Sequence, residues 1–271
     1  KVVTIDPVTR VEGHLSIRVQ LDRVDGELRV VDAWSTGTQF RGLESILVNR
    51  HPWDAVPITQ RICGVCPVSH GLAATLAIEQ ATGISAPPAG RILRNLVLGA
   101  NYLQSHILHF YHLCLPDFWT GPDMAPWRPN WQSDQRLTPA QNDLFTQHYL
   151  LALDMRRKAH EMGAVFGGRL PHPASFVPGG ITNKSSATRK TKFQPYLTEL
   201  TSFIQNVWLP DIELLGQVYD DNWDIGGGTG NLLAFGVFDL DAAGSSKLLG
   251  RGRVVGASES VLPVDVGSIT E

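Results

Sequence analysis

The feature that most constrains this chain is a succession of long helical patterns, each bounded by proline or glycine. Pro87-Pro88 breaks the chain before an amphipathic stretch over residues 89–113, which we expect to form one long helix ended by Pro116. Thr138-Pro139 predicts the start of a second long helix, and Gly167-Gly168 predicts its end. Helices of this length must bury their apolar faces against one another, so the sequence predicts a helical bundle.

The N-terminal part of the chain has a different pattern. Residues 2–5, 14–21 and 28–34 read as short strands, and Asp25-Gly26 between the last two is typical of a hairpin turn. The predicted fold class is therefore α+β, a small N-terminal antiparallel β-sheet packed beside a bundle of long α-helices. We expect a single domain over residues 1–271, in three parts: β-rich over 1–40, mainly helical over 41–220, and irregular with short strands over 221–271.

Shorter signals predict the remaining helices. Ser69 is the expected N-cap of a helix that ends at Gly83. Residues 187–219 read as helical, with an interruption or kink at Pro195 and at Pro210.

Composition excludes several classes of protein. The 23 Lys and Arg against 26 Asp and Glu give a net charge of −3, without the basic footprint of a nucleic-acid binder. Three cysteines are too few for a secreted disulfide framework. The most apolar stretch, residues 92–115, carries an arginine, several amides and three histidines, so it is a poor membrane span.

The densest cluster of reactive side chains is the segment Arg61-Ile62-Cys63-Gly64-Val65-Cys66-Pro67-Val68-Ser69-His70. The helix N-terminus that follows and Arg61 both favour the thiolate form of Cys63 and Cys66. The pair could be half of a metal site, a thioredoxin-like redox pair, or two buried thiols. The βαβ pattern of a redox domain is absent, and Cys114, the one other cysteine, cannot complete a four-cysteine zinc site.

Three further clusters are ambiguous when each is taken alone. Glu12 precedes a predicted strand, where a solvated carboxylate paired with Arg10 is the more common situation. Glu44 lies in a similarly unremarkable segment. His106, His109 and His112 recur at every third position, and hydrogen-bonded interior histidines are more common than a metal site for such a pattern.

Taken together, these clusters resemble in order and spacing the N-terminal half of the large subunit of nickel–iron hydrogenases. The likeness covers nearly the whole chain and leans toward the nickel–iron–selenium branch. The segments that carry it are Thr9-Arg10-Val11-Glu12-Gly13-His14, Phe40-Arg41-Gly42-Leu43-Glu44, Arg61-Ile62-Cys63-Gly64-Val65-Cys66, Asn95-Leu96-Val97-Leu98-Gly99-Ala100-Asn101-Tyr102, His109-Phe110-Tyr111-His112 and Phe166-Gly167-Gly168-Arg169.

The resemblance implies a role for each member of the cysteine cluster. Cys63 would be a terminal thiolate on nickel, and Cys66 a thiolate that bridges nickel and an iron carrying carbon monoxide and cyanide. His70 would donate a hydrogen bond to the bridging sulfur, and Arg61 would lie near the pair without ligating the metals. Glu12 would be the first proton carrier.

Two other residues acquire roles from the same resemblance. Glu44 would ligate Mg²⁺ (or Fe²⁺) in the helical interior, since carboxylate oxygens suit such ions. Asp117 would lie in the surroundings of the bimetallic site.

The implied reaction is heterolytic cleavage or formation of H2, with H2 and protons as substrates. Electrons would pass to iron–sulfur clusters in a small-subunit partner, because this chain has too few cysteines to hold them. The family closes with Asp-Pro-Cys-x-x-Cys-x-x-His, which supplies the other two nickel ligands and is missing here. A C-terminal polypeptide or remaining chain is therefore expected to bring them. The resemblance favours a periplasmic or membrane-associated location, with a cytoplasmic one as the alternative.

Three other functions are compatible with parts of the pattern. A hydrogen-sensing regulatory hydrogenase would carry the same motifs. The quinone-site subunit of respiratory complex I shares the fold, but Cys63 and Cys66 argue against it. A non-catalytic interaction module would explain the missing ligands.

Overall fold

The computed structural model describes residues 1–129, 134–258 and 260–269. The polar stretch at 120–136 reads as a loop in the sequence, and its residues 130–133 lie outside the described ranges. The chain begins with a sheet of three antiparallel strands, in the order β1 (Val2–Ile5), β2 (Leu15–Val24) and β3 (Glu27–Gly37). Asp25 and Gly26 have φ angles of 55° and 87°, as the predicted two-residue hairpin turn requires. The α+β fold class is confirmed.

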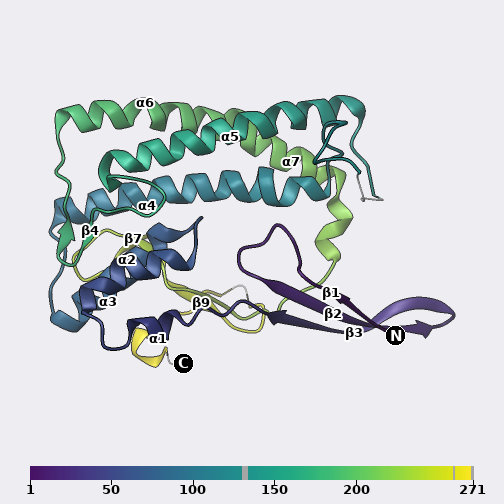
Figure 1. Ribbon diagram of the computed structural model, residues 1–271, viewed down its shortest axis with the longest axis horizontal. Coiled ribbons are helices and arrows are strands. Elements are labelled where there is room, and N and C mark those ends of the chain that lie inside the picture. The colour runs from purple at the N-terminus through teal and green to yellow at the C-terminus, as the bar shows by residue number, and fades with distance from the viewer. Residues whose placement is uncertain (130–133, 259, 270–271) are drawn as a thin grey trace.

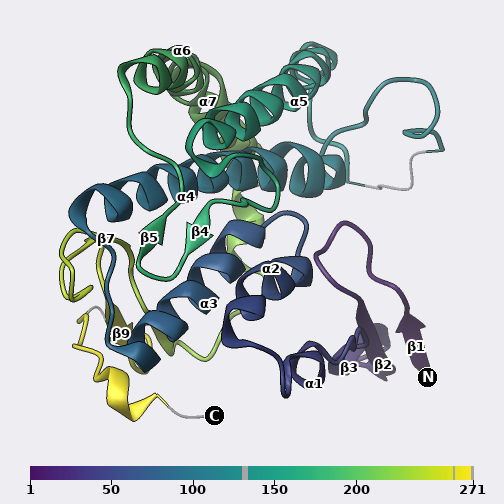
Figure 2. The same cartoon turned by 60° about the vertical axis from the view of Figure 1, so that its left-hand side comes forward.

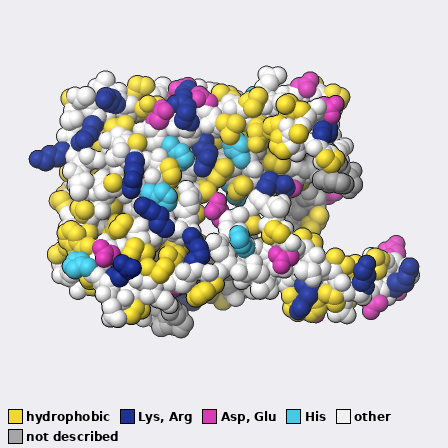
Figure 3. Space-filling model, viewed as in Figure 1, with side chains coloured by type: hydrophobic (Ala, Val, Ile, Leu, Met, Phe, Trp, Pro, Cys, Tyr) yellow, Lys and Arg dark blue, Asp and Glu magenta, His cyan; other side chains and the backbone are white. Residues whose placement is uncertain are grey.

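The sheet extends from the helical body as an arm. Figure 1 shows it pointing away from the long helices, and Figure 3 shows charged side chains at its tip. Every residue of β3 is exposed, although the alternation of β2 from Leu15 to Leu21 leaves one apolar face. The sheet thus lies beside the bundle without being buried against it.

The helices form the body of the molecule. Figure 1 shows α5 lying between α4 and α6, with α3 beneath α4. No helix in the described ranges is long and apolar enough to span a membrane. The bounds of the helices are α1 Leu43–Leu47, α2 Ala55–Thr59, α3 Pro67–Thr82, α4 Pro88–Leu108, α5 Pro139–Gly167, α6 Ala187–Phe203 and α7 Leu209–Val218.

The predicted bounds of α5 are confirmed. The Thr138 hydroxyl accepts a hydrogen bond from the backbone N–H of Gln141, whose side chain accepts one from the N–H of Thr138 in return. This capping box satisfies two donors that a helix start leaves open. Gly168, with φ 79°, ends the helix.

Other bounds differ from the prediction. Helix α3 starts at Pro67 rather than after Ser69, because proline suits the first helical position, where no N–H is needed. Pro195 lies inside an unbroken α6, where the exposed preceding turn leaves the freed carbonyl to water. Pro210 lies in the first turn of α7, after a π-helical turn at Ile204–Trp208.

The helix predicted over 89–113 also changes character near its end. Helix α4 stops at Leu108 and continues as a π-helical turn, His109–Cys114, followed by a 3-10 turn, Leu115–Asp117. Within the wide turn, fully buried Tyr111 donates a hydrogen bond of 2.6 Å to Asp211 of α7. The turn therefore joins α4 to α7 through a buried polar contact.

A buried ion pair fixes α3 against α4. Arg94 and Glu79 are 3% and 5% exposed, and their nearest nitrogen and oxygen are 2.6 Å apart. Arg94 also donates to the carbonyl oxygens of Val177 and Gly180, and Glu79 accepts from the N–H of Gly179. These contacts bind both helices to a short hairpin of β4 (Phe176–Val177) and β5 (Gly180–Ile181).

The described residues of the C-terminal part contain two pairs of short strands: β6 (Leu232–Ala234) with β9 (Gly252–Val254), and β7 (Val237–Asp239) with β8 (Lys247–Leu249). Asn95 of α4 donates to the carbonyl oxygen of Asp239, and Tyr102 packs on Phe238. These contacts hold the tail against α4, and Figure 2 shows β7 below the N-terminal end of this helix.

Candidate metal centre

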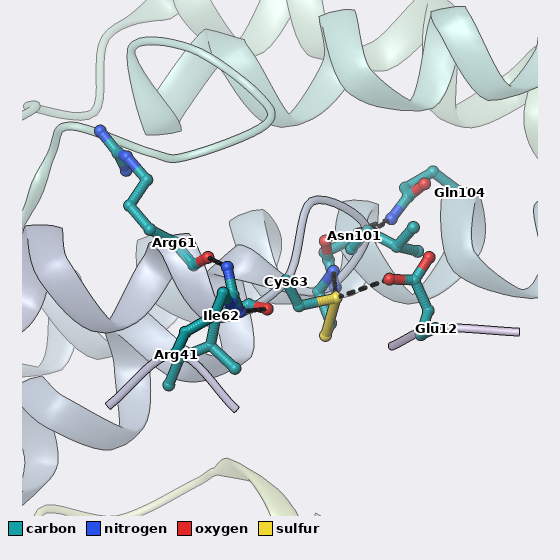
Figure 4. The surroundings of a disulfide bond; sticks show 9 residues. Glu12, Arg41, Arg61, Ile62, Cys63, Asn101 and Gln104 are labelled. Carbon is teal, nitrogen blue, oxygen red and sulfur yellow. Dashed lines mark hydrogen bonds between the residues drawn. A yellow bond between two sulfur atoms is a disulfide. The ribbon is translucent and has the colours of Figure 1, made fainter. Parts of the chain in front are cut away.

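The two paired cysteines lie on a tight turn between the 3-10 helix Gln60–Ile62 and α3. The extended backbone of Cys63 and the helix start after Cys66 bring the two sulfurs together, and the structure joins them in a disulfide (Figure 4). The backbone N–H of Cys66 points at Cys63 Sγ from 3.1 Å. An N–H donor so close to a sulfur stabilises a thiolate once the disulfide is reduced.

Glu12 lies beside this turn although it is distant in sequence. Its Oε2 lies 3.6 Å from Cys63 Sγ, and Figure 4 shows the carboxylate pointing at that sulfur. Gly13 has a φ of 85°, in the left-handed region that glycine adopts freely, so the chain can turn sharply between Glu12 and β2. The solvated pairing of Glu12 with Arg10 is not formed among the described residues.

Arg10 instead anchors the loop that carries Glu12. Its Nε donates a 3.0 Å hydrogen bond to the carbonyl oxygen of Leu113, and its guanidinium pairs with Asp117. Asp117 is more than half exposed and does not line the pocket at the cysteines. It is linked to the site by its ion pair with Arg10, which anchors the Glu12 loop.

A second arginine, Arg41, is hydrogen-bonded to the backbone just before the cysteine turn. Arg41 donates hydrogen bonds to the carbonyl oxygens of Arg61 and Ile62, as Figure 4 shows. The Arg61 side chain extends away from the sulfurs in the same view. Arg41 therefore fixes the backbone before Cys63, whereas the influence of the Arg61 charge on the sulfurs remains a prediction.

The sequence reasoning did not assign a role to Gln104, which contacts the turn from α4. Gln104 is fully buried and donates a 2.6 Å hydrogen bond to the carbonyl oxygen of Val65, between the two cysteines. Asn101 and Gln104 lie on the same helix face as buried Val97 and Ile107. Two amides on the buried face of an apolar helix were the available signal, because buried polar groups need partners.

A pocket of about 440 Å³ opens at the cysteines. Its polar lining comes from the predicted site residues Glu12, Glu44, Cys63, Cys66 and His70, together with Arg41 and Gln39. Five of the seven predicted site residues are therefore brought to one cavity, and Arg61 and Asp117 are not in its lining.

Glu44 differs from its expected surroundings. It lies in the first turn of the short helix α1 and is exposed, not enclosed in the helical interior. The five-residue helix has no buried residue, so it cannot enclose the carboxylate. Its role as a magnesium ligand remains a prediction.

His70 lines the pocket one turn into α3. Burial lowers the pKa of its imidazole below the ordinary value, which favours the neutral ring. No hydrogen bond links its ring to the Cys66 sulfur within the described ranges, so the predicted donation is not formed in this structure. The side chain lies at the correct end of the helix to approach that sulfur.

The histidines of α4 and of the π-helical turn that continues it do not form a metal site in this structure. His106 and His109 are exposed, contrary to the expected interior positions, since the buried face runs through Gln104 and Ile107 of α4 and Tyr111 of the turn. His109 lies 3.6 Å from the Cys114 sulfur. Burial lowers the pKa of His112 to about 4.

The donor set of the pocket fits half of a thiolate metal centre. No group of three or more histidine, cysteine, aspartate or glutamate side chains converges as a complete metal site in the part of the chain that is described. The two sulfurs of the turn are nevertheless soft metal ligands, and the neighbouring carboxylate is a proton acceptor beside them. A complete coordination sphere needs ligands from elsewhere.

Known proteins with similar sequences carry hydrogenase names. The large subunit of the periplasmic [NiFeSe] hydrogenase of Desulfomicrobium baculatum is 46% identical over 248 residues, covering 88% of this chain and 48% of that protein. The Escherichia coli (strain K12) hydrogenase-1 large chain is 32% identical over 325 aligned positions, covering 97% and 54%. The chain thus spans about half the length of the curated relatives it matches.

Comparison of the fold with solved structures, and of the sequence with family models, also finds hydrogenases. The reduced Ni-Fe-Se hydrogenase of D. vulgaris Hildenborough superposes with a TM-score of 0.92 at 42% identity, covering 98% of this chain and 54% of that one. The HoxL-like family matches residues 2–31, and the nickel-dependent hydrogenase family matches residues 41–125 and 117–271. The chain therefore belongs to the nickel-dependent hydrogenase family.

Proposed function

We propose that this chain is part of the catalytic large subunit of a nickel–iron hydrogenase of the nickel–iron–selenium branch, which cleaves or forms H2 heterolytically. The observation that carries the proposal is the 3.6 Å approach of the Glu12 carboxylate to the sulfur of Cys63, within a pocket that also holds Cys66. A soft ligand and a proton acceptor in contact are what heterolytic cleavage of H2 needs from a protein.

The metal ligands follow from this pocket. Reduction of the disulfide by two electrons frees two thiolates, of which Cys63 would bind nickel and Cys66 would bind both nickel and iron. When bound, the Ni-Fe centre, with carbon monoxide and cyanide on iron, supplies the site at which H2 is polarised and split. The other two nickel ligands would come from a C-terminal polypeptide or remaining chain.

Glu12 would move the proton. Its Oε2, 3.6 Å from Cys63 Sγ, is already within the distance of a hydrogen bond to sulfur, and Arg10 anchors the loop that carries it. The neutral His70 ring, on the same pocket, would donate to Cys66. Glu44 on α1 would bind Mg²⁺ (or Fe²⁺) at the rim.

The partners and location are proposed on the same basis. Iron–sulfur clusters would reside in a small subunit that accepts the electrons, since two of the three cysteines in this chain belong to the metal pocket. We place the assembled enzyme in the periplasm, since the Desulfomicrobium baculatum relative is named a periplasmic hydrogenase.

The test is an infrared spectrum and a nickel determination on the protein purified with its native partners. We expect bands of metal-bound carbon monoxide and cyanide, together with stoichiometric nickel. Cys63→Ser and Cys66→Ser should lose both. Cys114→Ser is the matched control, because Cys114 lies outside the pocket, and it should keep both.

Two results would overturn the proposal. One is full hydrogen-uptake activity in Cys66→Ser. The other is a folded, fully partnered protein without nickel or infrared bands, which would leave the non-catalytic interaction module. A hydrogen-sensing relative would show the same bands with slow turnover.

A further inference from the structure

The amide of Gln104 has every hydrogen-bonding site of its buried side chain engaged except one acceptor position. Its Nε2 donates to the carbonyl oxygen of Val65 at 2.6 Å and lies 3.3 Å from Oδ1 of Asn101. Its Oε1 accepts a 3.1 Å hydrogen bond from Nε of Arg156 on α5. One side chain thus connects α4, α5 and the cysteine turn.

The direction of these bonds is fixed by chemistry. Arg156 can only donate, so the amide oxygen of Gln104 must face it. The NH2 group must then face the Val65 carbonyl, which can only accept. A side chain at position 104 without a donor would remove the hydrogen bond to this part-buried carbonyl, or force the turn to move.

Arg156 also acts on the other half of the site. It forms no ion pair with a carboxylate within the described ranges, although it is half-buried. Burial lowers the pKa of Arg156, and the charge of Glu12 raises it. The hydrogen bond of Arg156 to Gln104 orients the amide that is bonded to the cysteine turn.

We propose that Gln104, oriented by Arg156, is the positioning residue that sets the direction of the Cys63 and Cys66 sulfurs relative to Glu12. Val65 directly precedes Cys66, so a hydrogen bond to its carbonyl fixes the Val65–Cys66 peptide plane, whose N–H points at Cys63 Sγ. The inference rests on the proposed function for its purpose, but its geometry does not require bound metal.

The test is the isosteric variant Gln104→Glu, which pairs with Arg156 but cannot donate to Val65. Asn95→Asp is the matched control, since it makes the same change on α4 and removes a donor to the carbonyl of Asp239, away from the turn. Both are compared with the unaltered protein, purified with its native partners from cells grown with and without nickel.

Two readouts follow. In the reduced, nickel-free protein, the ratio of the iodoacetamide alkylation rates of Cys63 and Cys66 should change about tenfold in Gln104→Glu, the equivalent of about 1.4 kcal/mol. In the nickel-loaded protein, the carbon monoxide band should shift. Asn95→Asp should alter neither. An unchanged alkylation ratio and an unshifted band in Gln104→Glu would overturn the proposal.

A second variant keeps the inference testable if Gln104→Glu does not assemble. Arg156→Gln leaves Gln104 in place but frees its amide to flip, so it should move the alkylation ratio in the same direction by a smaller factor. A wild-type ratio in this variant would refute the role of Arg156. If the unaltered protein lacks infrared bands, the proposed function fails, and the alkylation ratio still tests Gln104.

Discussion

The buried pair of Glu79 and Arg94 gives the sharpest prediction for stability. In Glu79→Gln, the amide oxygen can still accept from the N–H of Gly179, but the Arg94 guanidinium loses the charge that balances it. Arg94 is 3% exposed, so water cannot replace the carboxylate. Removing one partner of a buried pair lowers the free energy of unfolding by about 3–5 kcal/mol. Because one hydrogen bond is retained, we expect a loss of about 3 kcal/mol in this variant.

An exposed pair provides the control. Glu161 and Arg157 are paired on α5, with side chains 41% and 55% exposed, so Glu161→Gln should cost less than about 1 kcal/mol. An equal loss of unfolding free energy in the two variants would refute the argument that burial makes the Glu79–Arg94 pair important for stability.

The assay combines urea unfolding, followed by the fluorescence of the seven tryptophans, with hydrogen exchange. Global stability should fall in Glu79→Gln, and the amide of Gly179 in the β4–β5 hairpin should exchange faster. The double variant Glu79→Leu with Arg94→Met should recover only part of the loss. It removes the buried charge but leaves the carbonyls of Val177 and Gly180 without their donor.

Three further variants test other parts of the fold. Thr138→Ala removes the capping box of α5 and should lower the free energy of unfolding by about 1 kcal/mol in the same urea assay. Gly163→Ala should cost about 1–3 kcal/mol by overpacking, because the added Cβ would overlap the Leu170 side chain and lie 3.0 Å from the Cβ of Ala100; an unchanged melting temperature would contradict this. Burial lowers the pKa values of His112 and His160 to about 4, so stability should be full above pH 6.5 and fall between pH 6.5 and 4 as the unfolded state takes up protons first. His112→Phe should flatten that fall, by less than about 1.4 kcal/mol per pH unit, in pH-dependent urea titrations.

Local signals in the sequence determined several elements correctly. The hairpin turn at Asp25-Gly26, the cap at Thr138 and the helix end at Gly83 each depend on contacts within a few residues. The same holds for the proximity of Cys63 and Cys66, since two residues between them bring both sulfurs to one side of a turn. Such features can be predicted from the sequence because the residues that interact are close together in it.

Other local predictions failed where two signals competed. Ser69 is a good cap, but Pro67 occupies the first helical position and starts α3 earlier. Pro195 reads as a helix breaker, yet the packing of Phe193 and Leu200 on the buried face holds α6 together around it. A competing local preference decided the first case, and tertiary packing outweighed the local preference in the second.

The candidate site shows the same division. The sequence motifs predicted five site residues that the fold brings to one pocket: Glu12, Glu44, Cys63, Cys66 and His70. The motifs did not predict that α1 leaves Glu44 exposed. The hydrogen bonds that hold the site and the helices together join residues far apart in the sequence. The separation is 39 residues from Gln104 to Val65, 52 from Arg156 to Gln104 and 86 from Arg94 to Gly180.

No local pattern specifies which partner a buried amide or guanidinium will find. Burial obliges each such group to have a partner, and only the packing of α3, α4 and α5 decides which one lies within reach. The sequence by itself therefore determined the chemistry of the ligands and the local turn that pairs them. The tertiary structure decided how that turn is held and what faces it.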